Sequence, residues 1–183
     1  MVDDAQQAMG PGDTPSGGVL LRRATPDDHA RAGEVTVAAY ADFTLGPVDP
    51  YVERLRDAAT RDREAELWVA TPEDRDDEIL GCVTICPPGS PWRELSTGPD
   101  EGEFRMLAVA PKARGQGVGE GLARMCLDRF RADGARAVVI CSLPEMTTAH
   151  RLYERLGFRR APQLDWSPIP GVELHGYRID FEE

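Results

Sequence analysis

Four stretches of the chain show the spacing of apolar residues that is typical of amphipathic helices. The clearest one follows Gly117 and has apolar side chains three or four positions apart, at Val118, Leu122, Met125, Cys126 and Phe130. In an earlier stretch, Val52, Leu55 and Ala59 mark one apolar face of a helix. The expected helices cover residues 25–40, 52–63, 118–134 and 147–156.

Short apolar runs between these helices predict the strands of a sheet. The run from Glu103 to Val109 is dense in apolar residues from Met106 onward, as expected of a buried central strand. The expected strands cover residues 19–22, 66–71, 79–86, 103–109, 137–142 and 172–181. Strands and helices in this order predict an α/β fold (α+β, three layers) with a mixed central sheet of about seven strands, flanked by about four helices.

The chain length fits one domain. At 183 residues it falls within the range of roughly 100 to 200 residues that a single hydrophobic core usually serves. Residues 1–17 are rich in Gly, Pro, Asp and Gln without periodicity, so we expect a disordered tail there. Residues 18–183 are expected to form the single folded domain.

The net charge of the chain and its apolar runs indicate which partners and which compartment to expect. There are 21 basic and 32 acidic residues, a net charge of −11, which disfavours binding to nucleic acid and to anionic membrane surfaces. No apolar run approaches the roughly 20 residues that span a bilayer. The acidic start, Met1 to Asp4, lacks the apolar segment of a secretory signal, so a cytoplasmic location is expected. The abundance of Arg and Ala suggests a GC-rich bacterial genome.

The four cysteines, Cys82, Cys86, Cys126 and Cys141, do not have the spacing of a metal site, and the chain contains three histidines. We expect reduced core thiols and no metal.

Three glycines follow the strand at 103–109, around the start of the helix that begins at residue 118. Gly115, Gly117 and Gly119 leave backbone N–H groups accessible at the positive end of that helix, which predicts an anion-binding loop. A dinucleotide fingerprint needs a sixth-position glycine, but that position holds Glu120 or Leu122, depending on the register. A triphosphate loop needs a lysine at its end, and the loop has none.

The loop instead matches the pattern Arg-x-x-Gly-x-Gly at Arg114, Gly117 and Gly119. With Leu152-Tyr153 followed by Gly157-Phe158, it resembles the Gcn5-related N-acetyltransferase (GNAT) superfamily over about residues 103–160. The resemblance implies the GNAT fold and acetyl-CoA as the co-substrate. The residues that it implies for cofactor binding are Leu107, Ala108, Val109, Arg114, Gly115, Gln116, Gly117, Val118, Gly119 and Glu120.

The resemblance also implies catalytic roles. Tyr153 corresponds to a general acid that protonates the departing coenzyme A thiolate, and a core tyrosine is the alternative interpretation. Glu103 corresponds to a general base, with Glu101 and an ordered water molecule as alternatives. A solvated carboxylate, or an ion pair of Glu103 with Arg105, is the structural alternative. Cysteines on an apolar helix face or in a strand favour direct transfer over an acyl-enzyme.

The acceptor is expected to bind beside aromatic loop residues: Tyr40, Phe43, Trp92 in the loop 87–102, and the turn Asp165-Trp166. The predicted function is transfer of an acetyl group from acetyl-CoA to a primary amine of a small molecule or protein, in a ternary complex. A non-catalytic module that binds or senses acyl-CoA is the alternative. A homodimer is a further expectation of the resemblance.

Overall fold

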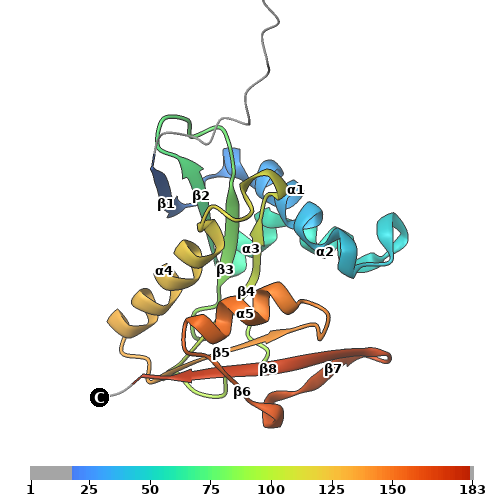
Figure 1. Ribbon diagram of the computed structural model, residues 1–183, viewed down its shortest axis with the longest axis vertical. Coiled ribbons are helices and arrows are strands. Elements are labelled where there is room, and N and C mark those ends of the chain that lie inside the picture. The colour runs from blue at the N-terminus through green and yellow to red at the C-terminus, as the bar shows by residue number, and fades with distance from the viewer. Residues whose placement is uncertain (1–17, 182–183) are drawn as a thin grey trace, which may run out of the picture.

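Eight strands form one sheet within residues 18–181, the part of the chain that the computed structural model describes (Figure 1). The strands are β1 (Val19–Arg23), β2 (Glu66–Pro72), β3 (Gly81–Ile85), β4 (Glu101–Val109), β5 (Ala137–Ser142), β6 (Arg159–Arg160), β7 (Trp166–Ile169) and β8 (Val172–Asp180). Their spatial order is β1-β2-β3-β4-β5-β8-β6, with β7 paired to β8. Neighbouring strands are antiparallel except β4 and β5, which are parallel. The tail expected at residues 1–17 lies outside the described residues.

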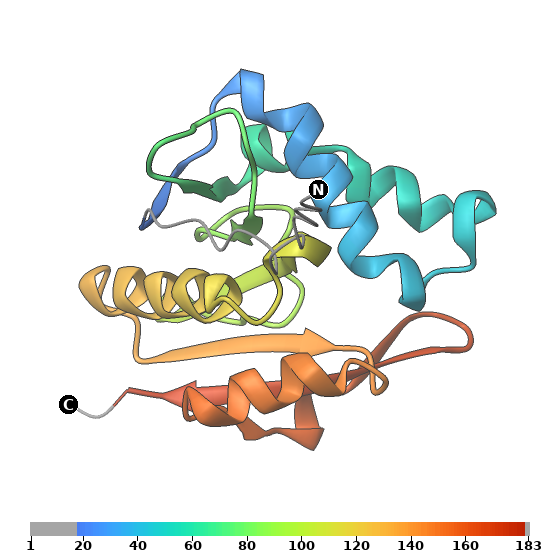
Figure 2. The same cartoon turned by 45° about the horizontal axis from the view of Figure 1, so that its top comes forward.

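Helices cover both faces of this sheet. They are α1 (His29–Tyr40), α2 (Pro50–Arg56), α3 (Ala58–Glu64), α4 (Val118–Ala132) and α5 (Thr147–Arg155). Helices α1 and α3 pack on one face with Leu67 and Val69 of β2, while α4 and α5 pack on the other (Figures 1 and 2). The mixed α/β, three-layer prediction is confirmed. Within residues 18–181, no helix has the length and apolar character needed to cross a membrane.

Helix α4 shows how directly the sequence specifies the elements on the second face. Its apolar stripe is buried as the spacing predicted, at Val118, Leu122, Ala123, Cys126, Leu127 and Phe130. The helix ends before Gly134, whose φ of 80° is the left-handed conformation that glycine adopts most easily. The backbone N–H of Ala135 then bonds the carbonyl of Phe130 at 2.9 Å, which completes the cap.

The single helix expected at residues 52–63 is wrong, because the chain breaks at Asp57. Asp57 has a ψ of 68°, and its carboxylate accepts a hydrogen bond from the backbone N–H of Thr60, so it caps a new helix. The break shifts the buried face by one residue, so Ala58 is buried and Ala59 is exposed. Other boundaries also differ from expectation by a few residues: α1 begins at His29 after a 3-10 turn at Pro26–Asp28, β3 begins at residue 81 and β4 at residue 101.

The sheet opens between its two parallel strands. Strand β4 pairs with β5 only from Glu101 to Glu103, although β4 continues to Val109. Beyond Glu103 the backbone groups on this edge of β4 therefore have no partner strand. On its other edge β4 carries a bulge, where Met106 has a φ of 51°, a costly conformation outside glycine. This local irregularity bends β4 beside the opening.

Candidate functional site

A cleft of about 650 Å³ occupies the opening between β4 and β5. Its walls come from the second half of β4, the end of β5, the glycine loop, helix α5 and the end of α1. The loop and both strands therefore meet in one cavity, although they are separated along the chain. An extended ligand can lie in this cleft beside the unpaired edge of β4, where backbone groups are available to it.

The glycine loop has the geometry of an anion cradle. Gly115 and Gly117 have φ values of 77° and 80°, which favour glycine, and an added Cβ on either would meet no atom within 4 Å. Within the described residues, the backbone N–H groups of Gly115, Gln116 and Gly117 make no backbone hydrogen bond. They lie at the start of the 15-residue helix α4, where the helix dipole adds positive potential.

Arginine side chains surround the same end of the cleft. Arg114, Arg151 and Arg155 line it, and all three are exposed. Arg155 pairs with Glu120 at 3.3 Å, in the first turn of α4. The acidic chain therefore concentrates positive charge beside the glycine loop, which suits a ligand with several phosphates.

Tyr153 lies in the wall of the cleft on α5 and is 7% exposed. Its ring packs 6.4 Å from Phe104 and 5.8 Å from Phe158, measured between centroids. The second contact confirms the helix ending expected at Gly157-Phe158, since the N–H of Phe158 also bonds the carbonyl of Tyr153 at 3.0 Å. Burial raises the pKa of Tyr153 well above 10, so the phenol carries its proton at neutral pH.

Most of the expected cofactor residues line the cleft: Leu107, Val109, Arg114, Gly115, Gly117, Val118, Gly119 and Glu120. Two do not. The side chain of Ala108 faces the opposite side of the sheet and packs with Leu67 and Cys82. The Gln116 amide points back into the loop and donates to the carbonyl of Lys112 at 3.0 Å.

The structure places Glu103 outside the cleft. Its side chain is 1% exposed, and the carboxylate accepts hydrogen bonds from the backbone N–H groups of Glu94, Leu95 and Ser96 at 2.9 to 3.1 Å. The hydroxyl of Ser96 adds a fourth bond at 2.8 Å. These bonds hold the loop before β4, so the geometry does not support the expected role of Glu103 as a base. Glu101 is engaged as well, pairing with Arg178 at 2.5 Å.

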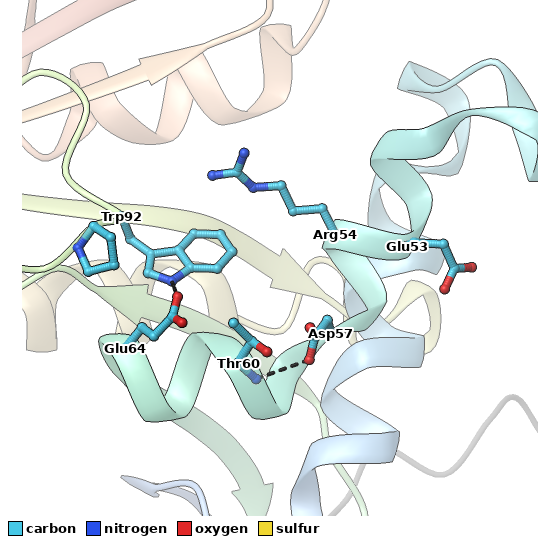
Figure 3. Close-up of a pocket in the computed structure, with 7 residues that line it drawn as sticks. Glu53, Arg54, Asp57, Thr60, Glu64 and Trp92 are labelled. Carbon is cyan, nitrogen blue, oxygen red and sulfur yellow. Dashed lines mark hydrogen bonds between the residues drawn. The ribbon is translucent and has the colours of Figure 1, made fainter.

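The aromatic residues expected at the acceptor site separate into two groups. Tyr40 and Phe43 line the cleft. Trp92 instead lines a second cavity of about 460 Å³ with Arg54 and Glu64, and its indole N–H donates to Glu64 at 3.1 Å (Figure 3).

Residues of the Asp165-Trp166 turn do not line the cleft either. The Asp165 carboxylate is held by Arg160 at 2.6 and 2.7 Å and by the N–H of Gly176 at 2.9 Å. Potential ligand atoms of Asp165, Glu173 and His175 lie within 4.8 Å of one another. The guanidinium of Arg160 already occupies the Asp165 end of that group.

Sequence reasoning missed several cleft residues, among them Arg151 and Arg155 on α5 and two residues on the strands that flank the opening. Arg105 lines the cleft and pairs with Glu94 at 2.7 Å, not with Glu103. Cys141, at the end of β5, also lines it, and burial raises the pKa of its thiol to about 11. The thiol is therefore protonated near neutral pH and is a poor nucleophile. No sequence signal marks either residue, because both depend on where β4 and β5 separate.

The sequence of this chain is similar to those of known acetyltransferases. The family model described as acetyltransferase (GNAT) family matches residues 34–158. Mycothiol acetyltransferase of Cellulomonas flavigena is 32% identical in an alignment covering 96% of this chain and 51% of that protein. Human N-acetylaspartate synthetase is 30% identical over 44% of this chain and 31% of its own length. The chain spans about half the length of the mycothiol acetyltransferases that it matches.

Solved structures share the fold. A GNAT-family acetyltransferase from Staphylococcus aureus has a TM-score of 0.69 and 11% identity, covering 90% of this chain and 100% of its own. A GNAT-family acetyltransferase from Brucella melitensis, solved with acetyl-CoA, has a TM-score of 0.59 and 21% identity, covering 91% of this chain and 90% of its own. The family match and the shared fold agree with the cleft, and this chain belongs to the acetyltransferase (GNAT) family.

Proposed function

We propose that this protein transfers an acetyl group from acetyl-CoA to a primary amine, directly and within a ternary complex. The observation that carries the proposal is the cleft itself, which joins an unpaired strand edge, a phosphate cradle and a buried tyrosine. Names of the relatives, mycothiol acetyltransferase and N-acetylaspartate synthetase, both denote acetyl transfer. Their acceptors differ, so the names alone do not identify the acceptor of this chain.

The cofactor fits the cleft in one orientation. Backbone N–H groups from Gly115 to Gly117 and the start of α4 would hold the pyrophosphate, with Arg114 beside it. Main-chain groups of Leu107 and Val109 would bind the pantetheine arm along the β4 edge that lacks a partner. This direction brings the thioester toward Tyr153 and Arg105.

Acetyl-CoA supplies the acetyl group as a thioester, whose C–S bond breaks as the C–N bond to the amine forms. Tyr153 donates its hydroxyl proton to the departing sulphur, and the proton lost by the amine returns to the phenolate through solvent. Because Glu103 is buried and hydrogen-bonded to the loop before β4, water is the favoured first acceptor of the amine proton. Direct transfer is preferred to an acyl-enzyme, because the Cys141 thiol is protonated.

Substitution of two buried tyrosines tests this proposal. Tyr177 is 4% exposed and lies 6.0 Å from Tyr153 between ring centroids, but it does not line the cleft. We expect Tyr153→Phe to lower kcat for thiol release roughly 10²- to 10⁴-fold, with acetyl-CoA affinity retained. Tyr177→Phe is the matched control and should stay within a few-fold of wild type. Acetyl-CoA binding without turnover of any amine would favour the sensing module.

A further inference from the structure

Arg105 stands apart from the other cations of the cleft. It lies two residues beyond the last β4–β5 pair, where the opening begins, whereas Arg114 belongs to the glycine loop and Arg155 reaches the first turn of α4. Phosphates bound at the glycine loop would lie close to Arg114 and Arg155. On the proposed function, Arg105 therefore lies past the thioester, at the end of the cleft left for the acceptor.

The guanidinium of Arg105 is fixed in place but only partly used. Its Nη1 pairs with Glu94 at 2.7 Å and donates to the carbonyl of Trp92 at 3.2 Å. Within the described residues, its Nε and Nη2 make no hydrogen bond, and neither is among the fully buried polar atoms that lack a partner. The side chain is 11% exposed and lines the cleft, so a ligand in the cleft can reach guanidinium donors that no protein group uses.

The charge of Arg105 is not cancelled by a carboxylate of its own. Arg54 lies 3.8 Å from the same Glu94 oxygen, so two guanidinium groups share one carboxylate. Both groups lie over the Trp92 ring, at 4.7 Å for Arg54 and 5.9 Å for Arg105, and Figure 3 shows Arg54 extending from α2 toward it. Burial is the largest influence on the pKa of Arg105 and lowers it, but Glu94, Tyr51 and the nearby cysteines together outweigh burial, and the pKa is raised.

The neighbouring wall supplies a neutral donor. Tyr40, at the end of α1, lines the cleft, and burial raises the pKa of its hydroxyl well above 10. A preorganised guanidinium with two adjacent free N–H groups is the arrangement that binds a carboxylate through two parallel bonds. We propose that the acceptor of this enzyme carries a carboxylate as well as the amine, and that Arg105 binds that carboxylate. This inference rests on the proposed function of the cleft.

Matched pairs of acceptors test the inference on the wild-type protein. The panel contains the common α-amino acids, β-alanine and γ-aminobutyrate, each beside its carboxamide, with saturating acetyl-CoA and thiol release as the readout. We expect at least one acid to exceed its carboxamide by about 10- to 100-fold in kcat/KM, the range of charge-assisted hydrogen bonds. The acid has the more basic amine, so greater availability of free amine does not explain such a preference.

Two variants assign the preference to one residue. Arg105→Gln should abolish the discrimination between acid and carboxamide while leaving acetyl-CoA affinity unchanged. Arg54→Gln removes the other guanidinium beside Glu94 and Trp92 but lies outside the cleft, so it should keep the preference.

The wild-type result stands even if Arg105→Gln does not fold. If no acid is preferred, or if every panel member is inert while acetyl-CoA binds, the inference is overturned and the cofactor site stands. Retained preference in a folded Arg105→Gln variant would show that Arg105 does not bind the acceptor carboxylate. Absence of acetyl-CoA binding would instead reject the proposed function.

Discussion

The carboxylate of Glu103 accepts hydrogen bonds from both the backbone N–H and the hydroxyl of Ser96, at 3.0 and 2.8 Å. Glu94 and Leu95 donate to the same carboxylate through their backbone N–H groups. A buried anion with four donors stabilises the loop before β4. The loop in turn carries Trp92 and Glu94, which hold Arg105. Glu103 therefore acts on the cleft through the loop, at a distance from the reacting atoms.

Replacing Glu103 by glutamine should affect stability more than chemistry. The amide nitrogen of Gln would face donors instead of accepting from them, so we expect the free energy of unfolding to fall by about 2 to 3 kcal/mol. Urea unfolding measures this loss. Ser96→Ala, which removes one of the four bonds, should cost about 1 kcal/mol. If Glu103→Gln were fully stable but removed the pH dependence of kcat/KM, Glu103 would be the base after all.

The raised pKa of Tyr153 predicts the shape of the pH profile. The acid form of a group is present below its pKa, so a pKa above 10 keeps the Tyr153 proton in place while the acceptor amine deprotonates. We expect kcat/KM to rise with pH toward the pKa of the amine, about 10.4 for a lysine-like amine, without a descending limb before pH 10. A decline that begins below pH 9 in steady-state assays would contradict this assignment.

Cys141 should be dispensable for the reaction. Its thiol pKa of about 11 leaves little thiolate near neutral pH, although the residue lines the cleft. We expect Cys141→Ala to retain kcat within about threefold, and mass spectrometry after brief mixing with acetyl-CoA to find no acetylated thiol. Cys126→Ala, at a buried site on α4, is the control for loss of a thiol. An acetylated Cys141 that passes its group to an amine would require a covalent mechanism.

Local signals in the sequence predicted much of the wall of the cleft. The helix ending at Gly157 and Phe158 depends on one glycine and one apolar contact, both adjacent in sequence, and it appears as expected. Helix α4 and the glycine loop could also be predicted from the sequence, because residue spacing and φ preference act within a few positions. Tyr153 is placed in the cleft by that helix ending.

Other features could not be predicted because they depend on contacts between distant segments. From the sequence, Asp57 can either continue a helix or cap a new one. Where the helix breaks, the buried guanidinium of Arg61 donates hydrogen bonds to Thr36 and Thr84 in distant segments and to the Leu55 carbonyl. The bulge at Met106 leaves no sequence signature, since no glycine marks its positive φ. Glu103 and Arg105 likewise find their partners in the loop at 92–96 and not in each other.

Calorimetric titration with acetyl-CoA of two glycine variants tests whether the glycine loop binds the phosphates of the cofactor. Gly117 and Gly134 stand at opposite ends of α4, share a φ of 80°, and would each place a Cβ in open space. Aspartate at either position brings similar backbone strain, but only Gly117→Asp puts a negative charge in the cradle. We expect at least a 100-fold weaker affinity for Gly117→Asp and nearly wild-type affinity for Gly134→Asp. Wild-type affinity in both variants would contradict a phosphate site at the glycine loop.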